Sequence, residues 1–67
     1  MTKDEILNNI TEARKLLDTV YYYAEAYNEA NRTNASPHML ELSRLMSWCD
    51  TCAMDAEAET EAHFQGV

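Results

Sequence analysis

The chain has 67 residues, of which 12 are Asp or Glu and 5 are Lys or Arg, so its formal net charge is −7. This length is typical of one small domain, and the acidic balance excludes a basic nucleic-acid binder. Gly and Pro occur once each, and apolar residues make up 46% of the chain. These values exclude a collagen-like repeat and a disordered tail.

The first expected element is one long helix over about residues 3–31. Thr2 and Glu5 have the spacing of a capping box at its start. Apolar residues then recur every three or four positions, as in a helix that packs along one seam. This predicted seam consists of Ile6, Ile10, Ala13, Leu17, Val20, Ala24 and Tyr27. Further apolar residues flank the seam on both sides, so the helix is expected to contact more than one neighbour.

A turn over about residues 32–36 and a second helix over about 37–60 are expected next, followed by a loose C-terminus. Ser36 fits the N-cap of the second helix, and Pro37 fits its first helical position. Apolar residues again follow three- and four-residue spacings. They are Met39, Leu42, Leu45, Met46, Cys49, Cys52, Ala53 and Ala56.

The predicted fold is all-α: a single domain over residues 1–67 that forms an antiparallel two-helix hairpin. One hairpin cannot cover both flanks of its apolar stripes, whereas two hairpins can bury them in a homodimeric four-helix bundle. A different protein that completes the bundle is the alternative. The residues expected in the core or dimer interface are Ile6, Ile10, Leu17, Val20, Leu42, Leu45, Cys49 and Cys52.

The two cysteines, Cys49 and Cys52, have a spacing that occurs in zinc and redox sites. A zinc site needs about four ligands, but His38 and His63 lie eleven residues from the nearest cysteine, roughly 16 Å along a helix. A redox pair normally opens a helix, and this pair is expected in mid-helix. We therefore expect two small apolar core residues, with no metal and no cofactor.

The partner-binding surface is expected at the acidic end of the second helix and at exposed aromatic side chains. Acids at a helix C-terminus oppose the helix dipole, and they can attract a basic partner. Exposed aromatic residues are favourable interface material. The alternatives are a solubilising acidic end and aromatic packing within the bundle. The candidate binding residues are Asp55, Glu57, Glu59, Glu61, Tyr22 and Trp48.

The chain carries no motif of a known catalytic site, such as a Gly-rich phosphate loop, a nucleophile elbow or H-E-x-x-H. We therefore expect no enzymatic activity. The N-terminus is polar and no apolar run is long enough to cross a membrane, so neither a signal peptide nor a membrane partner is expected. The expected location is the cytoplasm of a bacterial host, where thiols stay reduced.

The short, acidic, all-helical chain resembles in type the small inhibitors encoded by phages and prophages, including anti-CRISPR and other anti-defence proteins. This resemblance implies stoichiometric binding and blockade of a host protein without catalysis. The opening Met1-Thr2-Lys3 and the two helices are also similar to plasmid copy-control hairpin dimers of the Rop kind. Those proteins bind paired RNA through a basic and polar helix face. Because only Arg14 and Lys15 are available for such a face here, direct nucleic-acid binding is not expected.

Three alternatives to a protein-directed inhibitor remain open at this stage. The first is a nucleic-acid mimic, whose carboxylates would occupy a basic groove. The second is a bundle that holds a small anionic ligand. The third is a bundle that is stabilised by a bound metal ion.

Overall fold

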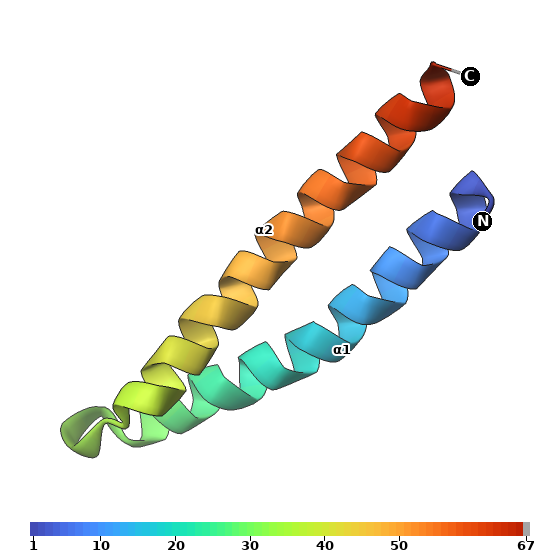
Figure 1. Ribbon diagram of the computed structural model, residues 1–67. Coiled ribbons are helices and arrows are strands. Elements are labelled where there is room, and N and C mark those ends of the chain that lie inside the picture. The colour runs from blue at the N-terminus through green and yellow to red at the C-terminus, as the bar shows by residue number, and fades with distance from the viewer. Residues whose placement is uncertain (67) are drawn as a thin grey trace.

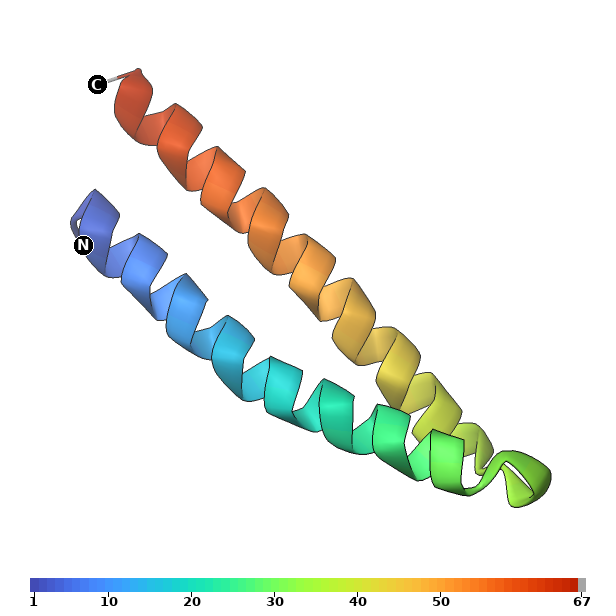
Figure 2. The ribbon, with the colours of Figure 1, turned by 180° about the vertical axis from the view of Figure 1, so that it is seen from behind.

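The computed structural model describes residues 1–66, which form two long helices joined by a short turn (Figure 1). Helix α1 spans Lys3–Ala30, the 3₁₀ turn η1 spans Arg32–Asn34, and helix α2 spans Pro37–Gln65. The helices run antiparallel, with both chain ends at the same end of the molecule (Figure 2). The predicted all-α hairpin is therefore confirmed.

Both helices begin where the sequence predicts, because local capping groups satisfy their first amides. The Thr2 hydroxyl accepts from the Glu5 backbone N–H, and the Glu5 carboxylate accepts from the Thr2 backbone N–H. The Ser36 hydroxyl likewise accepts from the Met39 backbone N–H at 3.2 Å. Each helix therefore has its own start signal, and the turn between them lies where no helical pattern continues.

Helix α2 continues to Gln65, beyond the boundary expected near residue 60. Phe64 is half-buried on the side of α2 that faces α1. The Lys3 ammonium forms an ion pair at 2.7 Å with the Glu61 carboxylate. These two interactions hold the last turns of α2 against the start of α1. The loose end expected after residue 60 is therefore helical through Gln65, and the Gly66 backbone N–H still donates to the Ala62 carbonyl oxygen at 3.3 Å; residue 67 lies outside the described residues.

A continuous stripe of half-buried or buried residues runs along each helix with three- and four-residue spacings, and we call the pair of stripes the seam. On α1 it consists of Leu7, Ile10, Arg14, Leu17, Tyr21, Ala24 and Asn28. On α2 it consists of Met39, Ser43, Met46, Asp50, Ala53, Glu57, Thr60 and Phe64.

The seam differs from the predicted one on α1. Ile10, Leu17 and Ala24 belong to both, but Ala13, Val20 and Tyr27 are exposed. Two stripes with the same spacing overlap on this helix, and the polar contacts of α2 decide which of them faces it. Periodicity alone could not separate the two.

The seam is closest-packed near the turn. Within residues 1–66, Ala24 is fully buried and Ser43 is 9% exposed, and no other residue is classed as buried. The Ser43 hydroxyl donates a hydrogen bond to Glu25, the neighbour of Ala24. The Asn28 amide donates to the Met39 carbonyl oxygen at 3.2 Å. Small residues and cross-helix hydrogen bonds therefore fix the register of the hairpin.

The molecule is a thin rod rather than a globule. Its extents are 54 × 15 × 13 Å and its radius of gyration is 15.5 Å. A compact chain of this length would have a radius of gyration of about 11 Å. Because the rod is two helices wide, most side chains outside the seam remain in contact with solvent. No helix within the described residues is long and apolar enough to cross a membrane.

Candidate partner-binding groove

The hairpin has two sides that differ in chemistry. Successive residues of an α-helix are rotated by about 100°, so the positions just after the seam lie roughly at right angles to it. In an antiparallel pair these positions point to the same side on both helices. The positions just before the seam point to the opposite side. We call the first the polar side and the second the apolar side.

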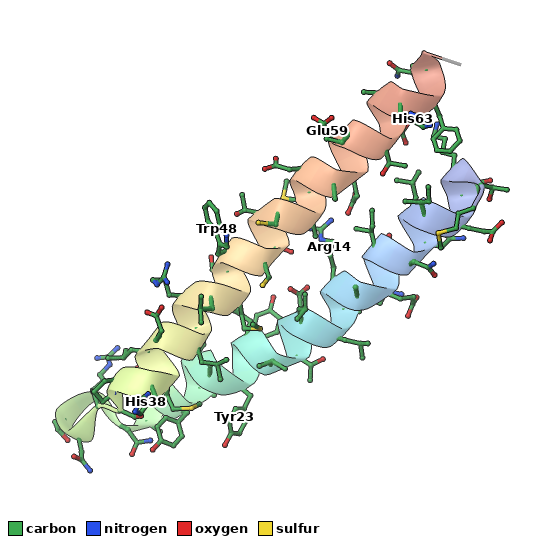
Figure 3. The ribbon with its side chains drawn as sticks, viewed as in Figure 1. Arg14, Tyr23, His38, Trp48, Glu59 and His63 are labelled. Carbon is green, nitrogen blue, oxygen red and sulfur yellow. The ribbon has the colours of Figure 1, made fainter. Side chains whose placement is uncertain are left out.

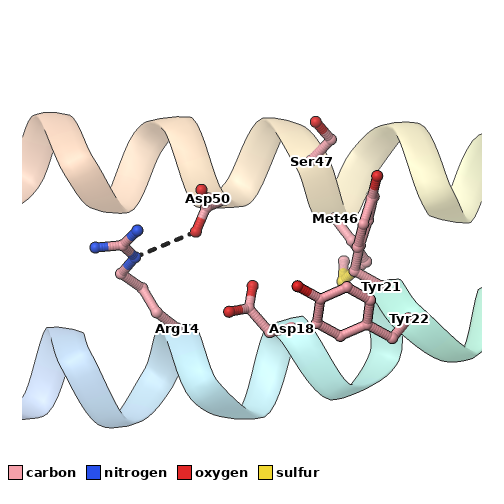
Figure 4. Close-up of a pocket in the computed structure, with 7 residues that line it drawn as sticks. All are labelled: Arg14, Asp18, Tyr21, Tyr22, Met46, Ser47 and Asp50. Atoms are coloured by element: carbon pink, nitrogen blue, oxygen red, sulfur yellow. Dashed lines mark hydrogen bonds and ion pairs between the residues drawn. The ribbon is translucent and has the colours of Figure 1, made fainter.

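Two adjoining hollows form one groove along the polar side. The first, shown in Figure 4, has a volume of about 300 Å³, and it is lined by Arg14, Asp18, Tyr21, Tyr22, Met46, Ser47 and Asp50. The second has a volume of about 400 Å³, and it is lined by Tyr21, Ser43, Arg44, Ser47, Trp48 and Thr51. The hollows share Tyr21 and Ser47. We call this combined surface the polar groove.

One end of the polar groove is set by a charged cluster inside the seam. Arg14 forms ion pairs with Glu57 at 2.7 Å and with Asp50 at 3.2 Å. Its side chain is 31% exposed and points into the space between the helices (Figure 3). The hydrogen bonds that Arg14 donates to Glu57 and then to Asp50 raise the pKa of Arg14 above its ordinary value. Both ion pairs of Arg14 are with acids of α2, so Arg14 joins the two helices and has a structural role.

Aromatic rings and one free carboxylate supply the rest of the groove. The Tyr21 and Tyr22 rings meet edge to face with their centroids 5.5 Å apart. Tyr22 is 67% exposed and Trp48 is 62% exposed. Asp18 is half-buried beside Tyr22, with no ion-pair partner among the described residues. A carboxylate beside open aromatic faces is a suitable environment for a basic side chain, through an ion pair and cation–π contact.

All five Lys and Arg side chains form ion pairs within the chain. Lys3 pairs with Glu61, and Arg14 pairs with two acids; Lys15, Arg32 and Arg44 each pair with the acid three residues earlier in the chain. Six acids are left without an ion pair among residues 1–66. They are Asp4, Glu5, Asp18, Glu25, Asp55 and Glu59. The surface therefore presents unpaired negative charge and no unpaired Lys or Arg.

The acidic end predicted as a binding surface is divided by the fold. Asp55 and Glu59 are exposed, and Glu59 points outward from α2 (Figure 3). Glu57 lies in the seam with Arg14, and Glu61 pairs with Lys3. The four predicted carboxylates therefore do not form one exposed surface on α2. The fold instead brings Trp48 and Tyr22 to the same groove.

The apolar side carries a second stripe on each helix, one position before the seam. On α1 this stripe consists of Ala13, Leu16, Val20, Tyr23, Tyr27 and Ala30, all of them exposed. On α2 its apolar part consists of Leu42, Leu45, Cys49, Cys52 and Ala56, and the stripe continues beyond them with His38 at one end and Glu59 and His63 at the other. We call these eleven residues the apolar face.

The residues predicted for the core or dimer interface separate between the seam and the apolar face. Ile10 and Leu17 lie in the seam, and Ile6 is half-buried beside it. Val20, Leu42, Leu45, Cys49 and Cys52 lie on the apolar face. The prediction had combined two surfaces that the hairpin keeps apart.

The thiols of Cys49 and Cys52 are free, with Cys49 half-buried and Cys52 exposed. No three His, Cys, Asp or Glu side chains among the described residues are grouped so that they could hold a metal ion. His38 and His63 lie at opposite ends of α2, as Figure 3 shows.

Sequence reasoning missed Arg14 and Ser43, whose contacts position the helices, and Asp18, which lines the groove. A signal was present for Arg14, because Asp50 and Glu57 are seven residues apart and therefore share one face of α2. An arginine within the opposite helix is the natural complement of such a pair. Asp18 had no comparable signal, since the groove exists only once the register of the two helices is set.

One surface ion pair gives a direct test of the charge arrangement. The hydrogen bond from Arg44 lowers the pKa of Glu41 below its ordinary value. Since the folded-state pKa is depressed, the pair contributes stability above the unfolded-state pKa and loses it as the pH falls through the folded-state pKa. An NMR titration of the Glu41 carboxyl should show this lowered pKa, and Arg44→Gln should return it to the ordinary range. An unchanged titration in that variant would contradict the assignment.

Comparison with known proteins adds no relative: no family model, no curated protein and no solved structure matches this chain.

Proposed function

We propose that this chain is a non-catalytic inhibitor of the anti-defence type that binds one protein of a bacterial host. The observation that carries the proposal is the polar groove, in which Asp18 lies beside the exposed ring of Tyr22 in one hollow and the exposed ring of Trp48 lines the adjoining one. Because every Lys and Arg is paired internally, the surface attracts a basic partner and repels an acidic one.

The partner segment that fits this groove carries a Lys or Arg next to an apolar residue. Its cation would pair with Asp18 and stack on Tyr22, while the apolar residue would cover Trp48. Aromatic side chains at the centre of an interface contribute most of its binding energy. Inhibition follows when the basic segment is one that the host protein needs for its own ligand.

The test is affinity capture from a nuclease-treated bacterial lysate with variants as controls. The wild-type chain should retain one stoichiometric partner, and Tyr22→Ala with Trp48→Ala should lose it. Met54→Ala removes another exposed apolar side chain, 54% accessible and outside the groove, and should retain the partner. The purified partner should then lose its activity in proportion to the chain added. Equal capture by both variants would contradict the role of the groove.

A second comparison separates groove binding from mimicry of a nucleic acid by the acidic end. Asp18→Asn should weaken capture at least tenfold, the equivalent of about 1.4 kcal/mol. Asp55→Asn combined with Glu59→Gln should have little effect, because these acids lie outside the groove. The opposite pattern, together with loss of binding at moderate salt, would favour the mimic.

A further inference from the structure

The hairpin exposes more surface than a folded chain of its mass normally does. Its accessible surface is 5122 Å². A folded monomer of 7.7 kDa is expected to expose about 4,300 Å². The excess is about 800 Å² per chain, which is the area that each partner buries in a standard protein interface. The exposed area is therefore sufficient for one stable dimer contact.

The seam provides little apolar burial of its own. Half of its positions on α2 are polar, namely Ser43, Asp50, Glu57 and Thr60. Leu16 is 71% exposed and Tyr23 is 64% exposed, so large apolar side chains lie outside the seam instead. A chain below about 70 residues usually needs a further source of stability. The apolar face is apolar surface that the single hairpin leaves exposed, and its burial would supply such stability.

Charge identifies what covers the apolar face. The chain has 17 charged residues, and among the positions one before the seam on both helices the only Asp, Glu, Lys or Arg is Glu59, one turn beyond the end of the apolar face. Two chains that each carry −7 can approach only where their charges are not brought together. A basic partner, by contrast, would be attracted to the unpaired acids elsewhere. The uncharged face therefore suits a second copy of the same chain.

We propose that two copies pack their apolar faces together about a twofold axis and form an antiparallel four-helix bundle. Each helix then contacts its own hairpin partner through the seam and the other copy through the apolar face. The second stripes have the three- and four-residue spacing that such packing requires. Leu16 and Leu45 lie in the new interface, whereas Leu40, one position after the seam on α2, stays outside it.

The same arrangement gives the assembly two binding sites. The polar groove lies on the opposite side of each hairpin from the apolar face. Packing the apolar faces together therefore leaves both grooves on the outside, pointing away from each other. This consequence rests on the proposed function: the dimer would bind two partner molecules at once. The self-association itself is independent of any partner.

The experiment is sedimentation equilibrium of the purified chain and two leucine variants. The wild type should sediment at twice 7.7 kDa, and Leu40→Glu should behave the same way, although Leu40 is 50% exposed. Leu16→Glu changes a more exposed leucine, and it should raise the dissociation constant by about a hundredfold or more, because twofold symmetry places two copies of the change in one interface. A wild type that sediments as a monomer throughout would overturn the proposal, as would equal effects of the two variants.

A measurement on the wild-type chain tests the dimer proposal even if Leu16→Glu fails to fold. Dimer formation makes the thermal midpoint rise with protein concentration. We expect that rise for the wild type. A midpoint independent of concentration would overturn the proposal. If the chain proved monomeric but still captured its partner, the dimer proposal would be wrong while the proposed groove would stand.

Discussion

Replacing Arg14 by alanine is expected to lower the thermal midpoint by several degrees. The change leaves Asp50 and Glu57 facing α1 with no cation between them, although both carboxylates are only about one-third exposed. Removing one member of a partly buried ion pair costs more than the pair itself contributes. Thermal unfolding followed by circular dichroism measures the effect.

Lys15→Ala is the matched control for Arg14→Ala. Lys15 is the next residue on α1, and its ion pair with Glu12 is exposed, with side chains 69% and 70% accessible. Exposed pairs of this kind contribute little to stability. Similar losses in the two variants would show that the charge cluster of Arg14 does not hold the hairpin together. Combining Arg14→Ala with Asp50→Ala and Glu57→Ala should recover part of the loss.

Replacing Ala24 by leucine is expected to destabilise the fold by about 1–3 kcal/mol, because overpacking displaces close-packed helices. Ala24 is fully buried, and it is next to the Glu25 that bonds Ser43 of α2. A larger side chain must push the helices apart and break this contact. For a domain of this size, each kcal/mol lowers the midpoint by about 4–8 °C.

Ala26→Leu provides the comparison for Ala24→Leu on the same helix. Ala26 is exposed, and surface substitutions usually change stability by less than about 0.5 kcal/mol. If the two variants melted alike, Ala24 would not mark the closest approach of α1 and α2.

Much of the fold was predictable because its signals are local. Thr2 with Glu5, and Ser36 with Pro37, mark two helix starts without reference to the rest of the chain. The end of α2 was misplaced because the acids near residue 60 oppose the helix dipole. The compensating contacts come from the other helix, through Lys3 and the half-buried side of Phe64.

The surfaces were harder to predict because they depend on which side of each helix faces the other. Ile10, Leu17 and Ala24 belong to two overlapping stripes on α1, and both stripes have the correct spacing. The polar contacts of Arg14 and Ser43 select between them. Once that choice is made, Tyr22 and Trp48 lie together in a groove, and the acidic end separates into paired and unpaired carboxylates.

The central claim is that the two sides of the hairpin have different roles, with the apolar face closed by a second copy and the polar groove left open. Cys52 is a natural reporter, since it is exposed in a single hairpin and lies on the apolar face. Cys49→Ala leaves it as the sole thiol. A cysteine introduced by Met54→Cys, with Cys49 and Cys52 both replaced by alanine, reports on the polar side.

The measurement is the rate at which a thiol reagent labels each protein over a wide range of chain concentrations. We predict that labelling of Cys52 slows as the concentration rises, while labelling at position 54 stays constant. A Cys52 rate that does not change with concentration would contradict the account, because the apolar face would then remain open to solvent.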